Sequence, residues 1–587
     1  MTPQELLPLL QRALADHEAG RANEAEAIYR RILAEHPDNA DALHLMGVLL
    51  TQRGKPAEAL PLLHRASQVA PNFAQGHFHL GQALAEMDRH NEALPCFARA
   101  LQLDPRYAML RVQAGSSLLS LGRINEAIDQ FRLAAQTEPN NGGFLGNYGF
   151  ALYRAGKAQE ALQILRRAVT MPPVEVPVLL QLGEVLWNQQ IYEEAARIAE
   201  QAERMAPRDI RVLILLGNCY QVLARFVGAA AAYRRVIEID ESNFDAWSNL
   251  ALTLLKMGQA KEALEMYEQV VARWPDRMDA LANRSLAILT LGDLDRGFKE
   301  YETRWRSAAF KHNTNFPAPR WDGGDVTGKT ILLTSEQGMG DVIQFIRYAP
   351  RVVARGAKVL VHCAPELRGV IETVEGISGI FHVGEKIPPI DFYAPLASLP
   401  AIFQTTLDTV PADVPYVRAD PARVARWKER LASAQNFKVG IVWAGTPLHQ
   451  NDCSRSSKLT DFAPLAMKGV TLFSLQKGKP ESQLTNPPPG MQITSLGQDL
   501  RSFADTAALL DCLDLLISVD TSVVHLAGAL GRPVWTLLAK GPDWRWMLDR
   551  EDSPWYPTMK LFRQRKMGDW SEVMQRVSAN LRQLVRL

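Results

Sequence analysis

The sequence predicts a multidomain protein in which an all-α superhelix of repeats is followed by an α/β region of two lobes. A proline recurs every 34 residues through the first half of the chain, alanines and glycines recur in the same phase, and beyond residue 305 strand-like runs alternate with amphipathic helices. Repeats of this kind stack on their neighbours into an open superhelix with a concave side. Strands that alternate with helices form parallel sheets.

Residues 1–305 contain the repeats. Prolines, alanines, glycines and bulky residues each recur there at a spacing of 34 residues. A proline just past a helix end stops that helix, and small residues let paired helices approach closely. Bulky residues on the second helix of each unit are expected in the core rather than at a ligand. The pattern resembles the tetratricopeptide repeat, a helix-turn-helix unit, in about eight to nine copies. The positions are Pro37, Pro71, Pro105, Pro139, Pro173, Pro207 and Pro275; Ala25, Ala59, Ala93, Ala127, Ala161, Ala195, Ala229 and Ala263; Gly47, Gly81, Gly115, Gly149, Gly183 and Gly217; and bulky Tyr29, Leu63, Phe97, Phe131, Leu165, Tyr233, Tyr267 and Tyr301.

Bulk composition excludes several classes of protein. At 587 residues the chain is too long for one hydrophobic core. Its net charge of +1 argues against a nucleic-acid binder held by bulk electrostatics. Five cysteines lie far apart without a CxxC pair, which favours a reducing compartment. Because we find no signal peptide and no apolar run of about 18 residues, we expect a cytoplasmic protein without a transmembrane segment.

Beyond the repeats, residues 306–328 are rich in Pro, Gly, Asn and Trp and are predicted to form a capping segment and linker. We expect the first α/β lobe at 329–435 and the second at 436–587. Open parallel sheets bind ligands at the carboxyl ends of their strands. Two Rossmann-like lobes with a cleft between them resemble the GT-B glycosyltransferases. Strands are predicted at 329–335, 358–363, 438–445, 469–476, 513–519 and 532–538, and helices at 342–356, 421–434, 502–512 and 521–530.

Three stretches are placed at the predicted cleft. The first contains Gly338, Gly340 and Asp341 and follows the first strand. Its glycines allow a sharp turn and a close backbone approach to a ligand. Asp341 could accept a proton from an acceptor hydroxyl that attacks a sugar carbon. The alternative is that Asp341 only caps the helix, because Asp is a preferred capping residue.

The second stretch, 443–459, is a polar loop after the first strand of the second lobe. Thr446, Arg455 and Ser456 offer hydroxyl and guanidinium donors to a diphosphate. Arg455 is the preferred phosphate ligand because its guanidinium can bond two oxygens at once. The alternative is a solvated loop with incidental charge.

The third stretch contains Asp520, Thr521, Ser522 and His525, where a strand ends and a helix begins. Backbone N–H groups at such a helix start can bind an anion. Because an aspartate repels phosphate, Asp520 is expected to bind sugar or ribose hydroxyls. The alternatives are a helix cap for Asp520 and simple packing for His525.

Together, the Gly338–Asp341 loop and residues 520–538 resemble glycosyltransferase family 9, the ADP-heptose:lipopolysaccharide heptosyltransferases. The resemblance implies an inverting, metal-independent reaction without a cofactor, with the acceptor on the first lobe and the nucleotide sugar on the second. It assigns the catalytic base to Asp341 and donor contacts to Arg455 and Asp520. Where the family has Asp-Thr-Gly, this sequence has Asp-Thr-Ser, with Ser522 in place of the glycine.

Aromatic residues near the end of the chain have two interpretations. Trp544 and Trp546 could stack on a base or help to recognise a sugar, but aromatics in so short a loop more often pack internally. No motif fixes the nucleotide, so both ADP-linked and UDP-linked sugars remain open.

A row of polar residues is expected on the concave side of the repeats, two residues before the lattice position that is glycine in most repeats. Amide side chains can pair with both the N–H and the C=O of an extended peptide. The row resembles the asparagine ladder of eukaryotic protein O-GlcNAc transferases, although Leu45 and Leu215 interrupt it. Simple solvation of the groove is the alternative. The row consists of His79, Gln113, Asn147, Gln181, Asn249 and Asn283.

These patterns favour an enzyme that glycosylates a protein or peptide held in the repeat groove. Two alternatives remain. In one, the α/β part is degenerate and the chain is a non-catalytic scaffold. In the other, the enzyme acts on a saccharide or lipid-linked glycan of the cell envelope. The sequence leaves the oligomeric state open.

Overall fold

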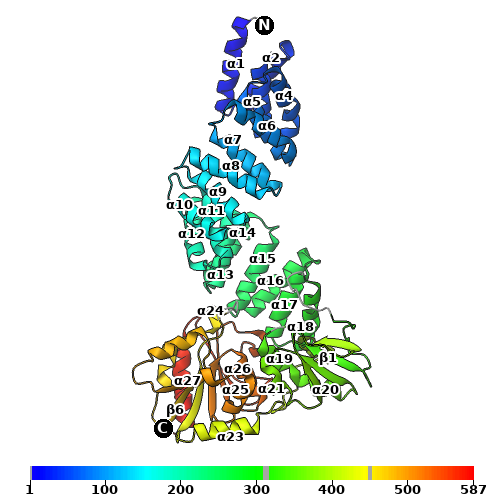
Figure 1. The fold of residues 1–587 in the computed structure, drawn as a ribbon, viewed down its shortest axis with the longest axis vertical. Coiled ribbons are helices and arrows are strands. Elements are labelled where there is room, and N and C mark those ends of the chain that lie inside the picture. The colour runs from blue at the N-terminus through cyan, green and yellow to red at the C-terminus, as the bar shows by residue number, and fades with distance from the viewer. Residues whose placement is uncertain (1–2, 308–315, 337, 447–451, 587) are drawn as a thin grey trace. The chain divides into compact units, whose positions relative to one another are not determined.

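The structure is a computed structural model that describes residues 3–307, 316–336, 338–446 and 452–586 (Figure 1). The chain divides into two compact units, Met1–Cys219 and Tyr220–Leu587. The first unit is built from paired helices, and the second combines further helix pairs with two parallel sheets. This arrangement confirms the predicted fold class.

The first unit contains the helices of the early repeats, which pack in consecutive pairs. The last of them, α13, extends past Cys219. The helices are α1 (Pro3–Glu18), α2 (Ala22–Glu35), α3 (Ala40–Gln52), α4 (Pro56–Val69), α5 (Ala74–Glu86), α6 (His90–Leu103), α7 (Ala108–Ser120), α8 (Ile124–Thr137), α9 (Gly142–Arg154), α10 (Ala158–Ala168), α11 (Val176–Asn188), α12 (Tyr192–Met205) and α13 (Ile210–Val222).

The second unit begins with the last repeats, which lead directly into the α/β part. The last repeat helix ends at Tyr301, and a short 3₁₀ helix follows. These elements are α14 (Phe226–Ile239), α15 (Phe244–Lys256), α16 (Ala260–Arg273), α17 (Met278–Thr290), α18 (Leu294–Tyr301) and η1 (Glu302–Arg306).

Lattice glycines make room for the bulky residues of the following helix. A Cβ added at Gly81 would lie 2.6 Å from the ring of Phe97, and one added at Gly115 would lie 2.8 Å from the ring of Phe131. The bulky lattice residues are core residues as predicted, since none is more than 8% exposed. The repeat pattern therefore encodes the packing of each helix pair.

The turn within each helix pair has the same left-handed backbone in every repeat. Glycine adopts positive φ without a Cβ clash, which explains its frequency at this position. Three copies place another residue there. The positions, with φ between 55° and 91°, are Gly20, Gly54, Asp88, Gly122, Gly156, Gln190, Ala224, Gly258 and Gly292.

The first sheet is four-stranded and parallel, in the order β3-β2-β1-β4. Its strands are β1 (Thr330–Thr334), β2 (Lys358–His362), β3 (Ile377–Phe381) and β4 (Phe392–Pro395). The single helix predicted after β1 is interrupted, because Pro350 has no N–H to donate to the preceding turn. It consists of α19 (Met339–Phe345), η2 (Ile346–Tyr348) and α20 (Ala349–Val353). The connecting helices are η3 (Pro365–Leu367), α21 (Arg368–Ile371), η4 (Leu396–Ser398), α22 (Leu399–Ile402) and α23 (Pro421–Arg430).

The second sheet is six-stranded and parallel, in the order β10-β9-β8-β5-β6-β7. The apolar runs predicted as strands at 438–445, 469–476, 513–519 and 532–538 form β5, β6, β8 and β9. The strands are β5 (Phe437–Val442), β6 (Val470–Ser474), β7 (Ile493–Ser495), β8 (Leu515–Val519), β9 (Val534–Leu538) and β10 (Met559–Arg563). The helices are α24 (Asp452–Arg455), η5 (Leu459–Leu465), η6 (Lys479–Thr485), η7 (Gly497–Asp499), α25 (Phe503–Leu510), α26 (Ser522–Ala529), η8 (Trp544–Trp546) and α27 (Trp570–Leu584).

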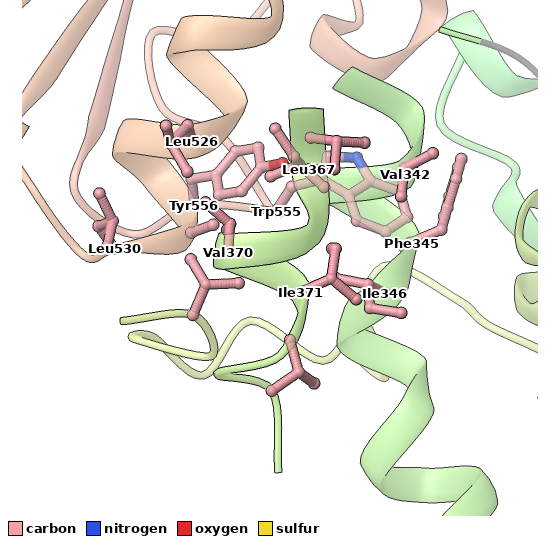
Figure 2. Close-up of a cluster of buried hydrophobic side chains, with 14 of the residues drawn as sticks. Val342, Phe345, Ile346, Leu367, Val370, Ile371, Leu526, Leu530, Trp555 and Tyr556 are labelled. Atoms are coloured by element: carbon pink, nitrogen blue, oxygen red, sulfur yellow. The ribbon is translucent and has the colours of Figure 1, made fainter. Parts of the chain in front are cut away.

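One buried cluster joins the last repeat to both sheets. Phe298 of α18, Phe345 of α19 and Leu526 of α26 belong to it, together with Trp555 and Tyr556. Figure 2 shows side chains of α19, α21 and α26 converging on these two aromatic residues. This shared core fixes the loop after β1 against the start of α26, and that places the site.

Candidate functional site

A cavity of about 1120 Å³ lies at the carboxyl ends of the second sheet's strands. The loop after β1 closes one side of it, and residues of α15 and α17 from the repeats line another. The predicted site residues that line the cavity are Gly338, Gly340, Asp341, Thr446, Arg455, Asp520, Thr521, Ser522, His525 and Trp544.

Asp341 lies in the first turn of α19 and is ion-paired with Arg545 of η8. Arg545 also bonds Asp543 Oδ1 at 2.8 Å and Gln344 Oε1 at 2.5 Å, and its side chain is 9% exposed. Burial raises the pKa of Asp341, and the Arg545 guanidinium opposes this increase. Because burial raises the pKa of this carboxylate and Arg545 lowers it, the group can be charged and still accept a proton.

Gly340 is required because His525 occupies the space beside it. A Cβ at Gly340 would lie 2.9 Å from Cδ2 of the imidazole. The ring is buried, its Nδ1 bonds the Tyr556 hydroxyl at 2.9 Å, and it stacks on Trp546 with 5.3 Å between centroids. Burial lowers the pKa of His525 well below its ordinary value. The neutral ring therefore packs the Gly338–Asp341 loop against α26.

Arg455 lies at the end of α24 beside the carboxyl end of β5. Its Nη1 donates to the backbone oxygen of Asp520 at 3.2 Å, and its Nε lies 3.5 Å from Asp452 Oδ1. Gly445 accommodates the guanidinium, because a Cβ there would lie 2.5 Å from Nη2. The side chain is 19% exposed and lines the cavity, as a phosphate ligand must.

Ser456 and Thr446, two other residues of the same polar loop, differ in position. Thr446 is exposed and lines the cavity. The Ser456 hydroxyl instead accepts a bond from the Gly445 N–H at 2.9 Å and donates to Asp452 at 2.8 Å. It therefore braces the loop from within. Residues 447–451 of this stretch lie outside the described residues.

Asp520, Thr521 and Ser522 form the connection between β8 and α26. Thr521 is the N-cap of α26, whose first N–H groups have no intrahelical acceptor. Burial raises the pKa of Asp520 to about 6, with a smaller contribution in the same direction from Asp543. This arrangement suits an anion at the helix start and a neutral hydroxyl partner at Asp520.

The two tryptophans predicted as base or sugar contacts are largely internal. Trp546 is fully buried and stacks on His525. Trp544 is 7% exposed, lines the cavity and packs edge-on against Phe298 of the last repeat. Packing is thus the principal visible role of both rings.

Two features of the site lie outside the sequence predictions. The first is Arg545, which lies between Trp544 and Trp546. In this segment the sequence singles out only the two tryptophans. A second buried pair joins Arg304 of η1 to Glu336, with Nη2 to Oε1 at 2.8 Å and an Arg304 side chain that is 0% exposed. Arg304 Nη2 also donates to Ser398 at 2.9 Å. This pair anchors the loop after β1 to the end of the repeats.

The polar row of the repeats is partly exposed at every predicted position: His79, Gln113, Asn147, Gln181, Asn249 and Asn283. Some of its members bond one another or a neighbour. Gln181 Nε2 donates to Asn147 Oδ1 at 3.3 Å, and His79 Nδ1 lies 2.8 Å from His44 Nε2. Peptide binding by the row stays a prediction.

Three further observations concern metal ligands, cysteines and helix length. Within the described ranges, no group of three or more His, Cys, Asp or Glu residues is arranged to hold a metal ion. All five cysteines are free. No helix in the described part of the chain has both the length and the apolar character to span a bilayer.

Models of known families match most of the repeats and part of the second sheet. Tetratricopeptide repeat models match residues 16–77, 74–107, 118–182, 180–244 and 248–311. The model of glycosyltransferase family 9 (heptosyltransferase) matches residues 465–568. The family 9 match includes the Asp520–His525 and Trp544–Trp546 regions, whereas Asp341 and Arg455 precede it.

Similar proteins cover only parts of the chain. Protein FlbA of Caulobacter vibrioides is 29% identical over 315 residues, which is 49% of this chain and 52% of FlbA. This chain thus spans about half the length of that curated relative.

Among solved structures, a chain of the APC/C hetero-tetramer Cut9-Hcn1 has a TM-score of 0.36 and 18% identity, covering 48% of this chain and 55% of that one. PilF of Pseudomonas aeruginosa has a TM-score of 0.32 and 20% identity, covering 35% of this chain and 94% of that one. Because both TM-scores are low, we draw no conclusion about this chain from these two structures. From the family matches, the chain combines tetratricopeptide repeats with a C-terminal glycosyltransferase family 9 domain.

Proposed function

We propose that this protein is an inverting glycosyltransferase that moves a sugar from a nucleoside diphosphate to a hydroxyl group of a protein or peptide. One observation carries the proposal: Asp341 and the start of α26 line the same cavity. A carboxylate and an anion-binding helix start are the two groups that direct displacement at a sugar carbon requires.

The acceptor hydroxyl loses its proton to Asp341 as its oxygen attacks the anomeric carbon. Arg545 bonds Oδ1 of Asp341, and Oδ2 is the proposed proton acceptor. The raised pKa of the carboxylic acid supports this role, since a stronger base removes the proton more readily.

The bond from the anomeric carbon to the diphosphate breaks, and the diphosphate leaves with the electron pair. Arg455 and the backbone N–H groups of Ser522 and Val523 are the donors that would stabilise its charge. With these donors the reaction needs no metal ion. Asp520 would bind a sugar or ribose hydroxyl.

The acceptor assignment rests on the repeats. Leu252 and Leu255 of α15 and Leu286 and Thr290 of α17 line the cavity together with Asp341. An acceptor chain bound along these helices would therefore reach the proposed base. A protein or peptide fits this surface, because repeats of this type expose one continuous face to extended chains.

A panel of ADP-sugars and UDP-sugars, incubated with the full-length protein and with lysate proteins as acceptors, tests the function. We expect transfer of one labelled sugar to protein. Transfer to a lipid-linked or free saccharide alone would replace the acceptor assignment. A folded protein that neither transfers nor hydrolyses any donor would support a scaffold instead.

A further inference from the structure

Lys256 is a residue of the repeats that faces the transferase cavity. It lies on α15, where Asn249, Leu252 and Lys256 share one helix face because they are three and four residues apart. Leu252 and Lys256 line the cavity, and so do Leu286 and Thr290, which occupy the same two positions one repeat later. The helix face that bears Asn249 of the polar row therefore continues into the cleft.

Backbone contact holds Lys256 beside the second sheet. A Cβ added at Gly541 would overlap the carbonyl oxygen of Lys256, and one added at Gly258 would lie 2.9 Å from the carbonyl oxygen of Lys540. Gly541 follows β9, and β9 pairs with β8, whose end leads to Asp520 and α26. Two glycines thus bring the turn after α15 against the loop next to the proposed anion site.

Among the described residues that line this cavity, Lys256 is the cation whose charge is both partly buried and unpaired. Within the described ranges its ammonium has no hydrogen-bond or ion-pair partner. Arg455 and Arg545 are paired with aspartates, and Lys477 donates to the Leu500 carbonyl. The other two lining cations, Lys479 and Arg501, are exposed.

The surroundings of Lys256 favour an anionic partner. Leu252, Leu255 and Leu286 line the cavity near it, and burial lowers its pKa. A cation in such a place interacts more strongly with a phosphate than an exposed lysine does, because less water screens the two charges.

We propose that Lys256 binds phosphate oxygens of the donor's diphosphate, so that the repeats supply one residue of the donor site. This inference rests on the proposed glycosyltransferase function. It makes the last repeats part of the chemistry as well as of acceptor binding.

Calorimetric titration of the full-length protein with ADP and with UDP tests the proposal. Lys256→Met removes the charge and keeps most of the stem, while Lys256→Arg retains the charge. The equivalent position one repeat earlier is Val222, so an apolar residue suits this fold. Lys261→Met, on α16 of the same repeat, is the matched control.

We expect Lys256→Met to weaken binding of the preferred nucleotide about tenfold, as for loss of one charged contact, and Lys256→Arg and Lys261→Met to retain it within about twofold. Equal affinity of Lys256→Met and the wild type would overturn the inference. If the wild type bound neither ADP nor UDP, the proposed function itself would fail, and the two failures are thus distinguishable.

Discussion

At the scale of single residues, Asp341 and Arg545 determine how the proposed base is protonated. Burial raises the pKa of Asp341 and Arg545 lowers it. The pair is sheltered from solvent, with side chains 22% and 9% exposed, so each charge depends on the other. Removing the arginine would leave a carboxylate in a poorly solvated place.

Arg545→Met should therefore raise the pKa of Asp341 further. Because the base is active when deprotonated, the acid limb of the rate against pH should move upward by about 1 to 2 pH units. The measurement is the pH profile of sugar transfer. Arg550→Met, which removes a partly exposed arginine paired with Asp552, is the control and should leave the profile in place. An unchanged profile in Arg545→Met would contradict the role of the pair.

Asp520 makes a separate prediction about stability. Its folded pKa of about 6 exceeds the ordinary value of 3.8, so the folded state loses stability as pH rises through this window. Asp520→Asn should then raise the free energy of unfolding by about 2 kcal/mol at pH 7.5 and have little effect below about pH 4. Urea denaturation at both pH values measures this. A variant less stable than the wild type at pH 7.5 would show that the carboxylate is stabilised in the fold.

At the scale of secondary-structure elements, three turns within the repeats lack the glycine that the other repeats have at the same position. Asp88, Gln190 and Ala224 adopt positive φ at a position that other repeats fill with glycine. A residue with a Cβ pays about 1–2 kcal/mol for this conformation. Nothing lies within 4 Å of a Cβ built at Gly54 or Gly122, so the cost comes from the backbone alone.

Ala224→Gly should stabilise the protein by about 0.5–1 kcal/mol, because relief of strain exceeds the added freedom of the unfolded chain. The measurement is chemical denaturation monitored by circular dichroism. Ala232→Gly, in the interior of α14, should destabilise by about 1 kcal/mol and serves as the matched control. Destabilisation by both changes would rule out strain at Ala224.

The sequence predicts elements well where the signal is local. The helix pairs follow from a lattice in which each residue contacts its own or the next helix, as Gly81 and Phe97 do. The β-strands at 438–445 and 513–519 follow from apolar runs. The sequence does not predict strands β3, β4, β7 and β10, because their segments lack a continuous apolar run. Pro350 causes the helix to be interrupted at Ile346–Tyr348. The amphipathic pattern alone does not reveal this interruption.

At the scale of the whole molecule, the site could be predicted only in part. Asp341, Arg455 and Asp520 follow strands and were recognisable from glycine turns and helix starts. Arg545 was not, because 204 residues separate it from Asp341 and only tertiary packing brings the two together. Lys256 is not recognisable in the sequence for the same reason, since only tertiary packing places the second sheet against this position of the repeat.

The last repeats and the two sheets belong to one compact unit, and all of them contribute to the cavity. Phe298 of α18 lies in the same buried cluster as Phe345 and Trp555, and Arg304 pairs with Glu336, which lies between β1 and α19. A site built in this way links the helices proposed to bind the acceptor to the proposed base through buried contacts.

The central claim is that Asp341 accepts the acceptor's proton, and one measurement tests it directly. Asp341→Asn keeps the shape of the side chain and still accepts a bond from Arg545, but it cannot take up the proton. The rate of sugar transfer should fall by about 100-fold to 10,000-fold, while the affinity for ADP or UDP changes little. Asp408→Asn, an exposed carboxylate elsewhere on the first lobe, should transfer at the wild-type rate. Wild-type transfer by folded Asp341→Asn would contradict the account.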